Sequence, residues 1–371
     1  EMTSSLVGSE MCIRDRYDII HSVDTEERQV LMGSKVTFDD IAAYTHFSKT
    51  TISRYFNNPE SVTLQNRKII SDALEALNYK NNKVARILAN GKSEFIGIII
   101  PHFEHQFYSS IVQHLIDTYT TYGYKFIIFL GKEDPDKERK YIRELLSYKI
   151  EGLIELSHNL PSEELKEIGI PVVSIEREDQ YISSVNTDNF YGGRLAAEQF
   201  IRDNCDVLIH VNTKDHEMAP GYQRIRGFID LCESHHSNYK IYQEDFPHSY
   251  DKLYQKIETI YDNIEKDYKG QKKGIFWSSD TYASIFINIL LKHGKSIPDE
   301  YEIIGFDNAP VSRESYLPFS TVSQDAKALA ENCIRIIQHQ INASKSNSRQ
   351  QIEHIVIEPS LILRSTTGQK A

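Results

Sequence analysis

The chain has 371 residues and a formal net charge of −11, which leaves room for two or three soluble domains with sizeable cores. Its longest apolar runs, such as "FIGIII" and "KFIIFL", are far shorter than the roughly 20 residues of a membrane-spanning helix and are typical of buried strands. The four cysteines (Cys12, Cys205, Cys232 and Cys333) show neither metal-ligand spacing nor a disulfide pattern. We therefore expect no metal and no cofactor, and a reducing cytoplasm is the simplest location.

The first 33 residues differ from everything that follows. "EMTSSLVGSEMCIRDR" has no hydrophobic periodicity and lacks the cationic start and apolar core of a signal peptide. It resembles a translated sequencing-adapter fragment, and Met32 would be a natural start because "MGSKVTFDDIA" begins like a folded module. We expect residues 1–33 to be an annotation artefact or a disordered tail.

Positive charge is concentrated in the next segment. Between Ser34 and Lys92 there are 9 lysines and arginines against 5 aspartates and glutamates, so this segment carries +4 and the rest of the chain −15. A small basic module on an acidic protein is the charge distribution of a nucleic-acid-binding domain.

The basic segment is predicted to form three short helices over residues 34–80. Thr37 and Ser48 are candidate N-caps of the first two helices. Ile52 and Phe56, four residues apart, give the second helix a buried edge. The opposite face carries Lys49, Thr50, Ser53 and Arg54. The third helix is expected from Leu64 to Leu77, with apolar residues at helical spacing.

Three helices with a tight second turn are typical of a helix-turn-helix, whose second helix lies in the major groove of DNA. Lysine, arginine and hydroxyl side chains suit phosphates and base edges. The alternative is an ordinary small bundle with a solvated charged face.

The segment 81–93 favours the DNA-binding interpretation. It contains "NKVARILA", a helix-compatible run that is too short to be stable alone. With the preceding "VTFDDIAAYTHFSKTTISRYFNN", it resembles the hinge helix and head-piece of the lactose/galactose-repressor (LacI/GalR) family. The resemblance continues from Val36 to Gly368 through "SEFIGIIIP", "VNTDNFYGGRLAAEQFI", "RIRGF", "IIGFDNA" and "LILRSTTG". Within the family, "EDPDKERKYI" and "APGYQRIRGF" look closest to sucrose-operon repressors of Gram-positive bacteria.

Residues 94–371 alternate short apolar runs with amphipathic segments. The runs are "FIGIII", "KFIIFL", "GLIEL", "PVVSI", "VLIHV", "YKIYQ", "GIFWS" and "EIIGF". Such alternation predicts an α/β fold with parallel sheets covered on both faces. The length indicates two lobes, as in periplasmic sugar-binding proteins.

In open α/β lobes, ligands bind beyond the carboxyl ends of the strands. The side chains there are aromatic, charged or hydroxylic: Phe107, Tyr108, Ser157, His158, Arg177, Phe246, Ser279, Asp280 and Asp307. Aromatic rings for stacking and charged groups for hydroxyls predict a carbohydrate site. The alternatives are core packing for the aromatics and capping of the following segments for Asp280 and Asp307.

The resemblance adds residue roles. Arg224 and Asp307 match the family's principal effector-contacting positions, and Phe246 matches its stacking aromatic, whereas Arg226 could be a surface ion-pair partner. It implies that Lys49, Thr50 and Arg54 read bases and that Ser48, Thr51, Asn57 and Tyr79 contact phosphates. Leu88 would wedge into the central base step. Thr37, Ser53, Asn82 and Ala85 are further candidates for DNA contact.

The resemblance thus implies a cytoplasmic, nucleoid-associated homodimer that binds a pseudo-palindromic operator and represses a sugar-utilisation operon. A dimer is favoured over a tetramer because the chain shows no heptad tail. The rival functions are a sugar-binding protein of transport or sensing type and, with less support, a sugar-processing enzyme. Nucleotide-binding, hydrolase and metalloprotease motifs are missing, so no enzyme is expected. The identity of the sugar, and whether it induces or co-represses, stay open.

Overall fold

The computed structural model describes residues 36–79, 93–103, 105–131, 134–177, 180–214, 220–247, 249–345 and 351–368. The chain divides into two compact units, residues 1–91 and 92–371. We call the described part of the first unit the head. The predictions for residues 1–33 and for the hinge helix, with Asn82, Ala85 and Leu88, lie outside the described residues.

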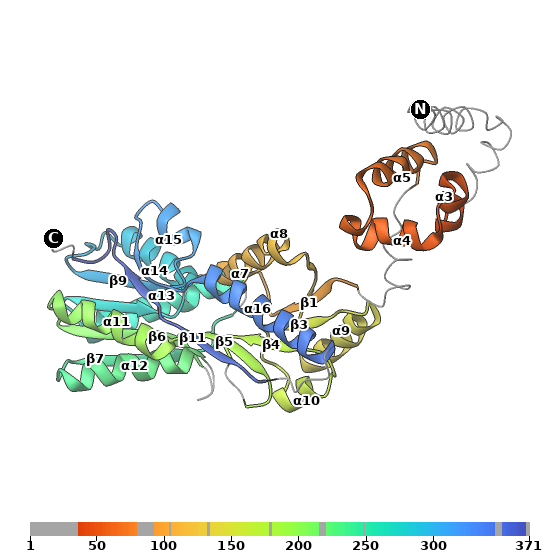
Figure 1. The fold of residues 1–371 in the computed structure, drawn as a ribbon. Helices are drawn as coiled ribbons and strands as arrows, with labels where there is room; N and C mark the ends of the chain where they lie inside the picture. The colour runs from red at the N-terminus through yellow and green to blue at the C-terminus, as the bar shows by residue number, and fades with distance from the viewer. Residues whose placement is uncertain are drawn as a thin grey trace, which may run out of the picture. The chain divides into compact units, whose positions relative to one another are not determined.

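The head consists of α3 (Phe38–Thr45), α4 (Lys49–Asn57), a 3-10 turn (Pro59–Ser61) and α5 (Leu64–Ala76), which Figure 1 draws in orange and red. Both predicted caps are confirmed, because the Thr37 hydroxyl accepts from the Asp40 backbone N–H and Ser48 caps α4 through Thr51. The third helix is also confirmed to within one residue of its predicted end.

A small apolar core holds the three head helices together. It is built on four buried side chains, one of them Ile52 of α4: Ile41, Ile52, Val62 and Ile70. The Phe38 and Phe56 rings stack on its edge with centroids 5.1 Å apart, and Tyr79 tilts against both. With Ile52 buried, Lys49, Thr50 and Arg54 are left on the exposed face of α4.

The larger unit contains two six-stranded sheets, and we call each sheet with its helices a lobe. The first sheet has the order β11-β5-β4-β3-β1-β2 and the second β12-β10-β9-β8-β6-β7. The first comprises β1 (Phe95–Ile100), β2 (Lys125–Leu130), β3 (Gly152–Glu155), β4 (Val172–Ile175), β5 (Ser183–Thr187) and β11 (His354–Ile357). The second comprises β6 (Val207–Thr213), β7 (Tyr239–Glu244), β8 (Lys273–Trp277), β9 (Tyr301–Phe306), β10 (Ser320–Ser323) and β12 (Ser360–Ile362). Every pairing given for these strands is parallel except β10 with β12.

Helices cover both sheets, as Figure 1 shows for each lobe. The first lobe has α7 (Gln106–Asp117), α8 (Tyr119–Tyr122), α9 (Pro135–Ser147), α10 (Ser162–Lys166) and α16 (Ala326–Lys345). The second lobe has α11 (Asn189–Arg202), α12 (Pro220–Ser234), α13 (Tyr250–Asp267), α14 (Asp280–Lys292) and α15 (Pro310–Glu314). The predicted two-lobed α/β fold is confirmed, and the predicted apolar runs are all strands.

The chain passes between the lobes after β5, after β10 and after β11, because each of these strands is followed by an element of the other lobe. We call these places the three crossovers. The Thr187 hydroxyl donates to the Gln324 side-chain oxygen (2.7 Å), which joins the first two crossovers. The Asp188 N–H donates to the Ile357 carbonyl (2.9 Å), which joins the first and third.

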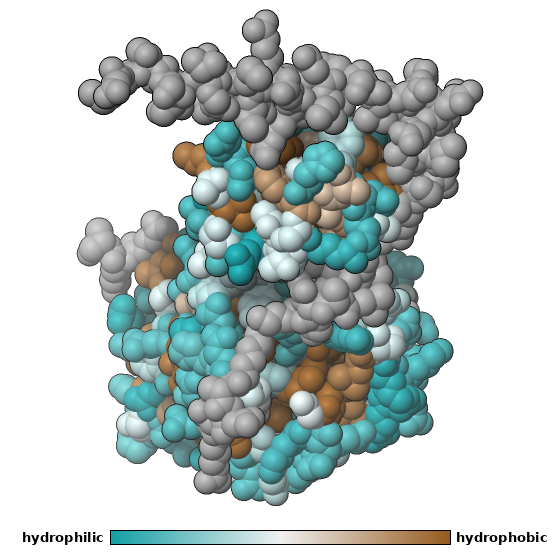
Figure 2. Space-filling view, turned by 45° about the vertical axis from the view of Figure 1, so that its right-hand side comes forward, coloured by the Kyte–Doolittle hydropathy of each residue, from teal (hydrophilic) through white to brown (hydrophobic). Residues whose placement is uncertain are grey.

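On the face drawn in Figure 2, hydrophilic side chains predominate, with apolar patches between them. In the part of the chain that the structure describes, no helix has both the length and the apolar character needed to cross a membrane.

Candidate functional site

The candidate site residues predicted from the sequence lie in two places. One is the exposed face of α4 in the head, and the other is the set of strand ends in the larger unit. On α4, Lys49, Thr50 and Arg54 are exposed and Ser53 is half-buried. The Lys49 ammonium forms an ion pair with the Asp39 carboxylate of α3. The face therefore offers cationic and hydroxylic donors, with one carboxylate beside them.

The hydroxyls at the helix starts already serve the backbone. The Ser48 hydroxyl accepts from the Thr51 N–H (3.2 Å) and lies 3.0 Å from the Thr51 hydroxyl. Thr37 donates its N–H and its hydroxyl to one oxygen of Asp40, each at 2.7 Å, and these bonds lower the pKa of that carboxyl. Ser48 and Thr51 remain exposed or half-exposed at the start of α4, where backbone N–H groups attract anions.

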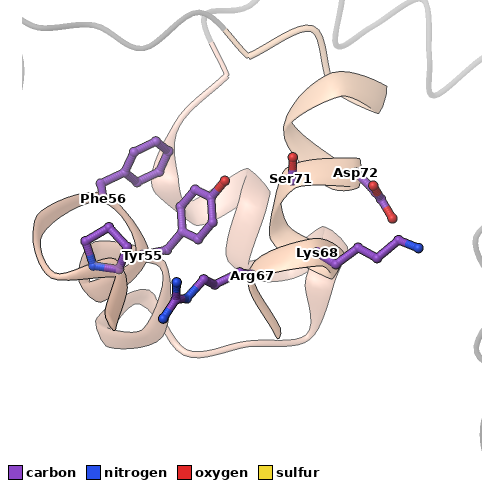
Figure 3. A pocket seen from close by; sticks show the side chains of 7 residues that line it. Tyr55, Phe56, Arg67, Lys68, Ser71 and Asp72 are labelled. Atoms are coloured by element: carbon purple, nitrogen blue, oxygen red, sulfur yellow. The ribbon is translucent and has the colours of Figure 1, made fainter. Parts of the chain in front are cut away.

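Sequence reasoning did not foresee an open depression in the head between α4, the 3-10 turn and α5. Tyr55, Phe56, Pro59, Arg67, Lys68, Ser71 and Asp72 line it (Figure 3). Arg67 is held in place by two hydrogen bonds to the Glu60 carboxylate, each 3.1 Å, and by one to the Val62 carbonyl (2.7 Å). This arginine therefore braces the turn between α4 and α5.

In the larger unit, Arg224 of α12 reaches the ends of several strands. Its Nε donates to the Asn189 side-chain oxygen (2.7 Å), and a terminal nitrogen donates to the Ser278 carbonyl (2.7 Å). The guanidinium lies over the Phe306 ring, 3.6 Å from its centroid. These contacts fix the plane of the guanidinium, and among the described residues none bonds to the other terminal nitrogen, which leaves it for a further acceptor.

Asp307 follows β9 and lies near Arg224. Burial raises the pKa of Asp307 to about 7, while Arg224 and a hydrogen bond from the Gln324 amide (2.7 Å) oppose that rise. The backbone of Asp307 has a φ of 111°, a conformation that non-glycine residues rarely adopt, and such outliers cluster at ligand sites.

Asp280, by contrast, is fully buried, and its oxygens accept from the Ala309 N–H and the Thr321 hydroxyl, both at 2.7 Å. Burial raises its pKa well above the ordinary value. These donors come from segments distant in the sequence, so the contacts are not the capping of the following segment that was the alternative for Asp280. Phe107 is similarly packed in the core of the first lobe.

Aromatic rings from both lobes meet at these strand ends. Phe246, after β7, packs against Tyr282 of α14 with centroids 4.4 Å apart. The His105 ring of the first lobe lies 5.3 Å from Tyr282, and Tyr108 lies beside His105. Burial, and next the Asp307 carboxylate, raise the pKa of Tyr108, so its hydroxyl is neutral.

His158 and Arg177 hold the loops after β3 and β4. The His158 Nε2 lies 2.8 Å from the Ile175 carbonyl, and Arg177 donates to the Leu160 carbonyl at 2.6 Å. Burial lowers the pKa of His158 and favours the neutral ring. Ser279 is buried at the N-cap position of α14, and no partner within the described residues reaches its hydroxyl.

Behind His158 lies a pair of fully buried carboxylates, Glu138 of α9 and Glu155 of β3. The Ser157 hydroxyl contacts both, and the Asn159 amide donates to Glu138 (2.8 Å). Burial, and next the neighbouring Glu155, raise the pKa of Glu138 to about 7.

Five residues at this place were missed from the sequence: His105, Glu176, Asn189, Tyr282 and Gln324. Glu176 accepts from the Thr187 N–H (2.6 Å) and the Asn189 amide (2.7 Å), so it links the end of β4 to the first crossover. The strand-end rule applies equally to Glu176, which directly follows β4. Asn189 and Gln324 lie at crossovers, and no apolar run in the sequence predicts where these crossovers occur.

Comparison with known families places both units. The family model described as bacterial regulatory proteins, lacI family, matches residues 37–82. A second family model, described as periplasmic binding proteins and sugar binding domain of LacI family, matches residues 93–243. A third, described as periplasmic binding protein-like domain, matches residues 197–367.

Curated relatives cover most of the chain. A sucrose operon repressor of Streptococcus mutans is 30% identical over 312 residues, which are 84% of this chain and 94% of the relative. A ribose operon repressor of Halalkalibacterium halodurans is 28% identical over 89% of this chain and 97% of its own.

Solved structures share the fold. The lac repressor dimer bound to operator and the anti-inducer ONPF has a TM-score of 0.75 at 19% identity, covering 90% of this chain and all but 1% of its own. A periplasmic binding protein/LacI transcriptional regulator from Alkaliphilus metalliredigens, complexed with D-xylulofuranose, has a TM-score of 0.64 at 28% identity, covering 75% of this chain and 100% of its own.

Proposed function

The chain belongs to the LacI family of bacterial regulatory proteins, and from that premise we propose that it represses a sugar-utilisation operon in response to a saccharide bound between its lobes. The family membership makes it a DNA-binding transcriptional regulator with a sugar-responsive domain. The operon, the particular saccharide and the residues that contact DNA and sugar are the subject of the proposal.

The exposed face of α4 supports the assignment of DNA contacts. Lys49, Thr50 and Arg54 present donors for base edges, as the major groove requires. Ser48 and Thr51 lie at the start of the same helix, where phosphate contacts are favourable. Asn57 and Tyr79 complete the proposed phosphate contacts of the described head, and Thr37 and Ser53 are further proposed DNA contacts.

The strand ends of the larger unit support a saccharide site. Phe246 and Tyr282 supply ring faces on which a sugar can stack. Arg224, Asp307 and Asn189 supply donors and acceptors for hydroxyl groups. Tyr108, His158, Arg177 and Ser279 complete the proposed set, and we leave out Phe107 and Asp280, which serve the cores.

Sucrose is the first candidate and ribose the second, because relatives that cover most of this chain are named for those operons. The saccharide is bound and released unchanged, since the proposed side chains hold it by stacking and hydrogen bonds. The saccharide can change operator affinity only if it binds one arrangement of the two lobes more tightly than another.

We propose that the regulator acts in the cytoplasm as a homodimer, because one head reads one half-site of a pseudo-palindromic operator. The first lobe offers apolar side chains for such a dimer. Ile116 and Tyr119, on α7 and α8, are exposed, and the edge strand β2 is half-exposed along its whole length.

The observation that carries the proposal is the arrangement of Arg224, which joins Asn189 at a crossover to Ser278 at a strand end while facing Asp307. Isothermal titration of the full chain with sucrose and ribose tests it. Saturable binding of one of them, lost in Arg224→Ala, is the expected result, and chemical conversion of the bound sugar would favour the enzyme alternative.

A further inference from the structure

The first residue of α4, Lys49, is ion-paired with Asp39, in the first turn of α3. We propose that Asp39 determines operator specificity by positioning Lys49 for base reading and keeping its ammonium away from phosphates. This inference rests on the proposed DNA contact of Lys49. Figure 1 shows α3 and α4 as neighbouring helices of the head.

As an acidic residue in the first turn of α3, Asp39 favours the start of that helix, but this role does not require a contact with Lys49. The capping box of α3 is made by Thr37 and the adjacent Asp40, not by Asp39. Both partners of the ion pair are about two-thirds exposed, at 65% and 64%, and exposed ion pairs contribute little to folding. The effect of the pair is therefore to be sought in what it does to Lys49.

An unpaired lysine at this position would favour phosphates. Its flexible four-carbon stem carries a compact charge, and phosphate contact is the sequence-independent part of DNA binding. Asp39 occupies one of the three ammonium donors, so the direction of the remaining two is restricted. The carboxylate also repels nearby phosphates.

The positioned ammonium has a preferred base. In the major groove guanine presents two acceptors, O6 and N7. The Lys49 ammonium, held in place by Asp39, is a donor that suits these acceptors. We therefore expect a G·C pair at the half-site position that Lys49 contacts.

The test starts from the operator that the full-length chain selects out of a randomised duplex DNA library. Binding is then measured on this operator, on single-pair variants of it and on random duplex, at several salt concentrations. The proteins are wild type, Asp39→Ala, Asp39→Glu, Lys49→Ala and the double variant Asp39→Ala/Lys49→Ala. Asp72→Ala is the matched control, because it removes an exposed carboxylate from α5 of the same head.

For Asp39→Ala we expect several-fold tighter binding to random DNA, and a steeper salt dependence by about one phosphate contact. Discrimination at one half-site position should fall roughly ten-fold. Asp39→Glu keeps the carboxylate, so its binding to random DNA, its salt dependence and its base discrimination should stay close to those of wild type. Asp72→Ala should leave base preference unchanged, and Asp39→Ala should have no effect on base preference once Lys49 is alanine.

Three outcomes would overturn the inference. Base preference unchanged in Asp39→Ala would show that Asp39 does not position Lys49. The same loss in the Lys49→Ala background would show that Asp39 acts independently of it. A wild-type chain that selects no sequence would refute the proposed DNA contacts themselves, and so can be told apart from the other two.

Discussion

At the scale of single residues, Arg224 has the clearest consequence for the saccharide. Its two hydrogen bonds and the Phe306 ring hold the guanidinium in one orientation before any ligand binds. Replacing Arg224 with alanine should remove a charge-assisted contact of about 1.5–3 kcal/mol and weaken saccharide binding roughly ten- to hundred-fold. Calorimetric titration measures the loss, and operator affinity without sugar should stay unchanged.

Arg226, exposed two residues further along α12, provides the control for Arg224. Arg226→Ala removes the same charge from the same helix and should bind the saccharide like wild type. If both variants lost binding equally, the effect would come from the charge or folding of α12 and not from a contact with the sugar.

The carboxylate pair Glu138 and Glu155 predicts a pH dependence of stability. The pKa of Glu138 is about 7 in the fold and higher than its ordinary value of 4.5, so the folded chain retains a proton that the unfolded chain has lost. Stability from this group is therefore complete below pH 4.5 and is lost as pH rises through 7. Glu138→Gln mimics the protonated carboxyl and should lose less stability than wild type between pH 5.5 and 8.

Urea unfolding of the full chain at both pH values measures this difference. Glu144→Gln, an exposed change on the same helix, should follow wild type. Other buried carboxylates, Asp280 and Glu302, are common to all three proteins and cancel in the comparison. A wild-type chain that lost no more stability than Glu138→Gln would contradict the retained proton on Glu138.

At the scale of elements, the head depends on the buried edge of α4. Ile52 is fully buried among the three helices, so Ile52→Ala should cost about 2–5 kcal/mol. Leu64→Ala, at a side chain that is 79% exposed, should change stability by less than about 0.5 kcal/mol. Hydrogen exchange of head amides in the full chain distinguishes them, and equal protection in both variants would contradict the packing described for α4.

Gln324 links the lobes at the second crossover, because it bonds both Thr187 and Asp307. Gln324→Ala should reduce the saccharide's effect on operator affinity more than it reduces saccharide affinity. Gln113→Ala, exposed on α7, is the control. Equal losses of binding and of coupling in Gln324→Ala would show that Gln324 is only a ligand contact.

How far the sequence predicts these elements depends on their composition. The apolar runs became strands because β-branched and aromatic residues fill both faces of a buried parallel sheet, and the helix caps were visible as Thr37 and Ser48. The short strands β5, β10, β11 and β12 were missed. "SSVNT" and "STVS" are polar and pair only because the neighbouring strands are already in place.

Contacts between distant segments limited the prediction of the sites. The strand-end rule predicts Arg177, Phe246 and Asp307 as site residues but could not distinguish Asp280, whose hydrogen bonds come from Ala309 and Thr321. The Lys49–Asp39 pair joins two helices, and its geometry depends on how α3 packs on α4. The sequence pattern indicates which residue types stand at the sites, whereas packing decides which of their side chains remain available for a ligand or for DNA.

At the scale of the whole molecule, positive charge is confined to one segment, because residues 34–92 carry +4 and the rest of the chain −15. The acidic remainder is repelled by DNA, so affinity has to come from residues 34–92 and should fall steeply with salt. Each lobe is built on one continuous sheet but is assembled from separate segments of the sequence, because the chain passes between the lobes three times. If one lobe moves relative to the other, the backbone at the three crossovers therefore has to be strained or relaxed.

Operator affinity of the full-length wild-type chain, measured with and without saturating saccharide, tests the central claim most directly. The account predicts that the chain prefers its selected operator over random duplex and that sucrose, or else ribose, changes this affinity at least several-fold and saturably. By linkage, operator DNA should change the affinity for that saccharide by the same factor. A saccharide that binds at the strand ends while leaving operator affinity unchanged would contradict the account.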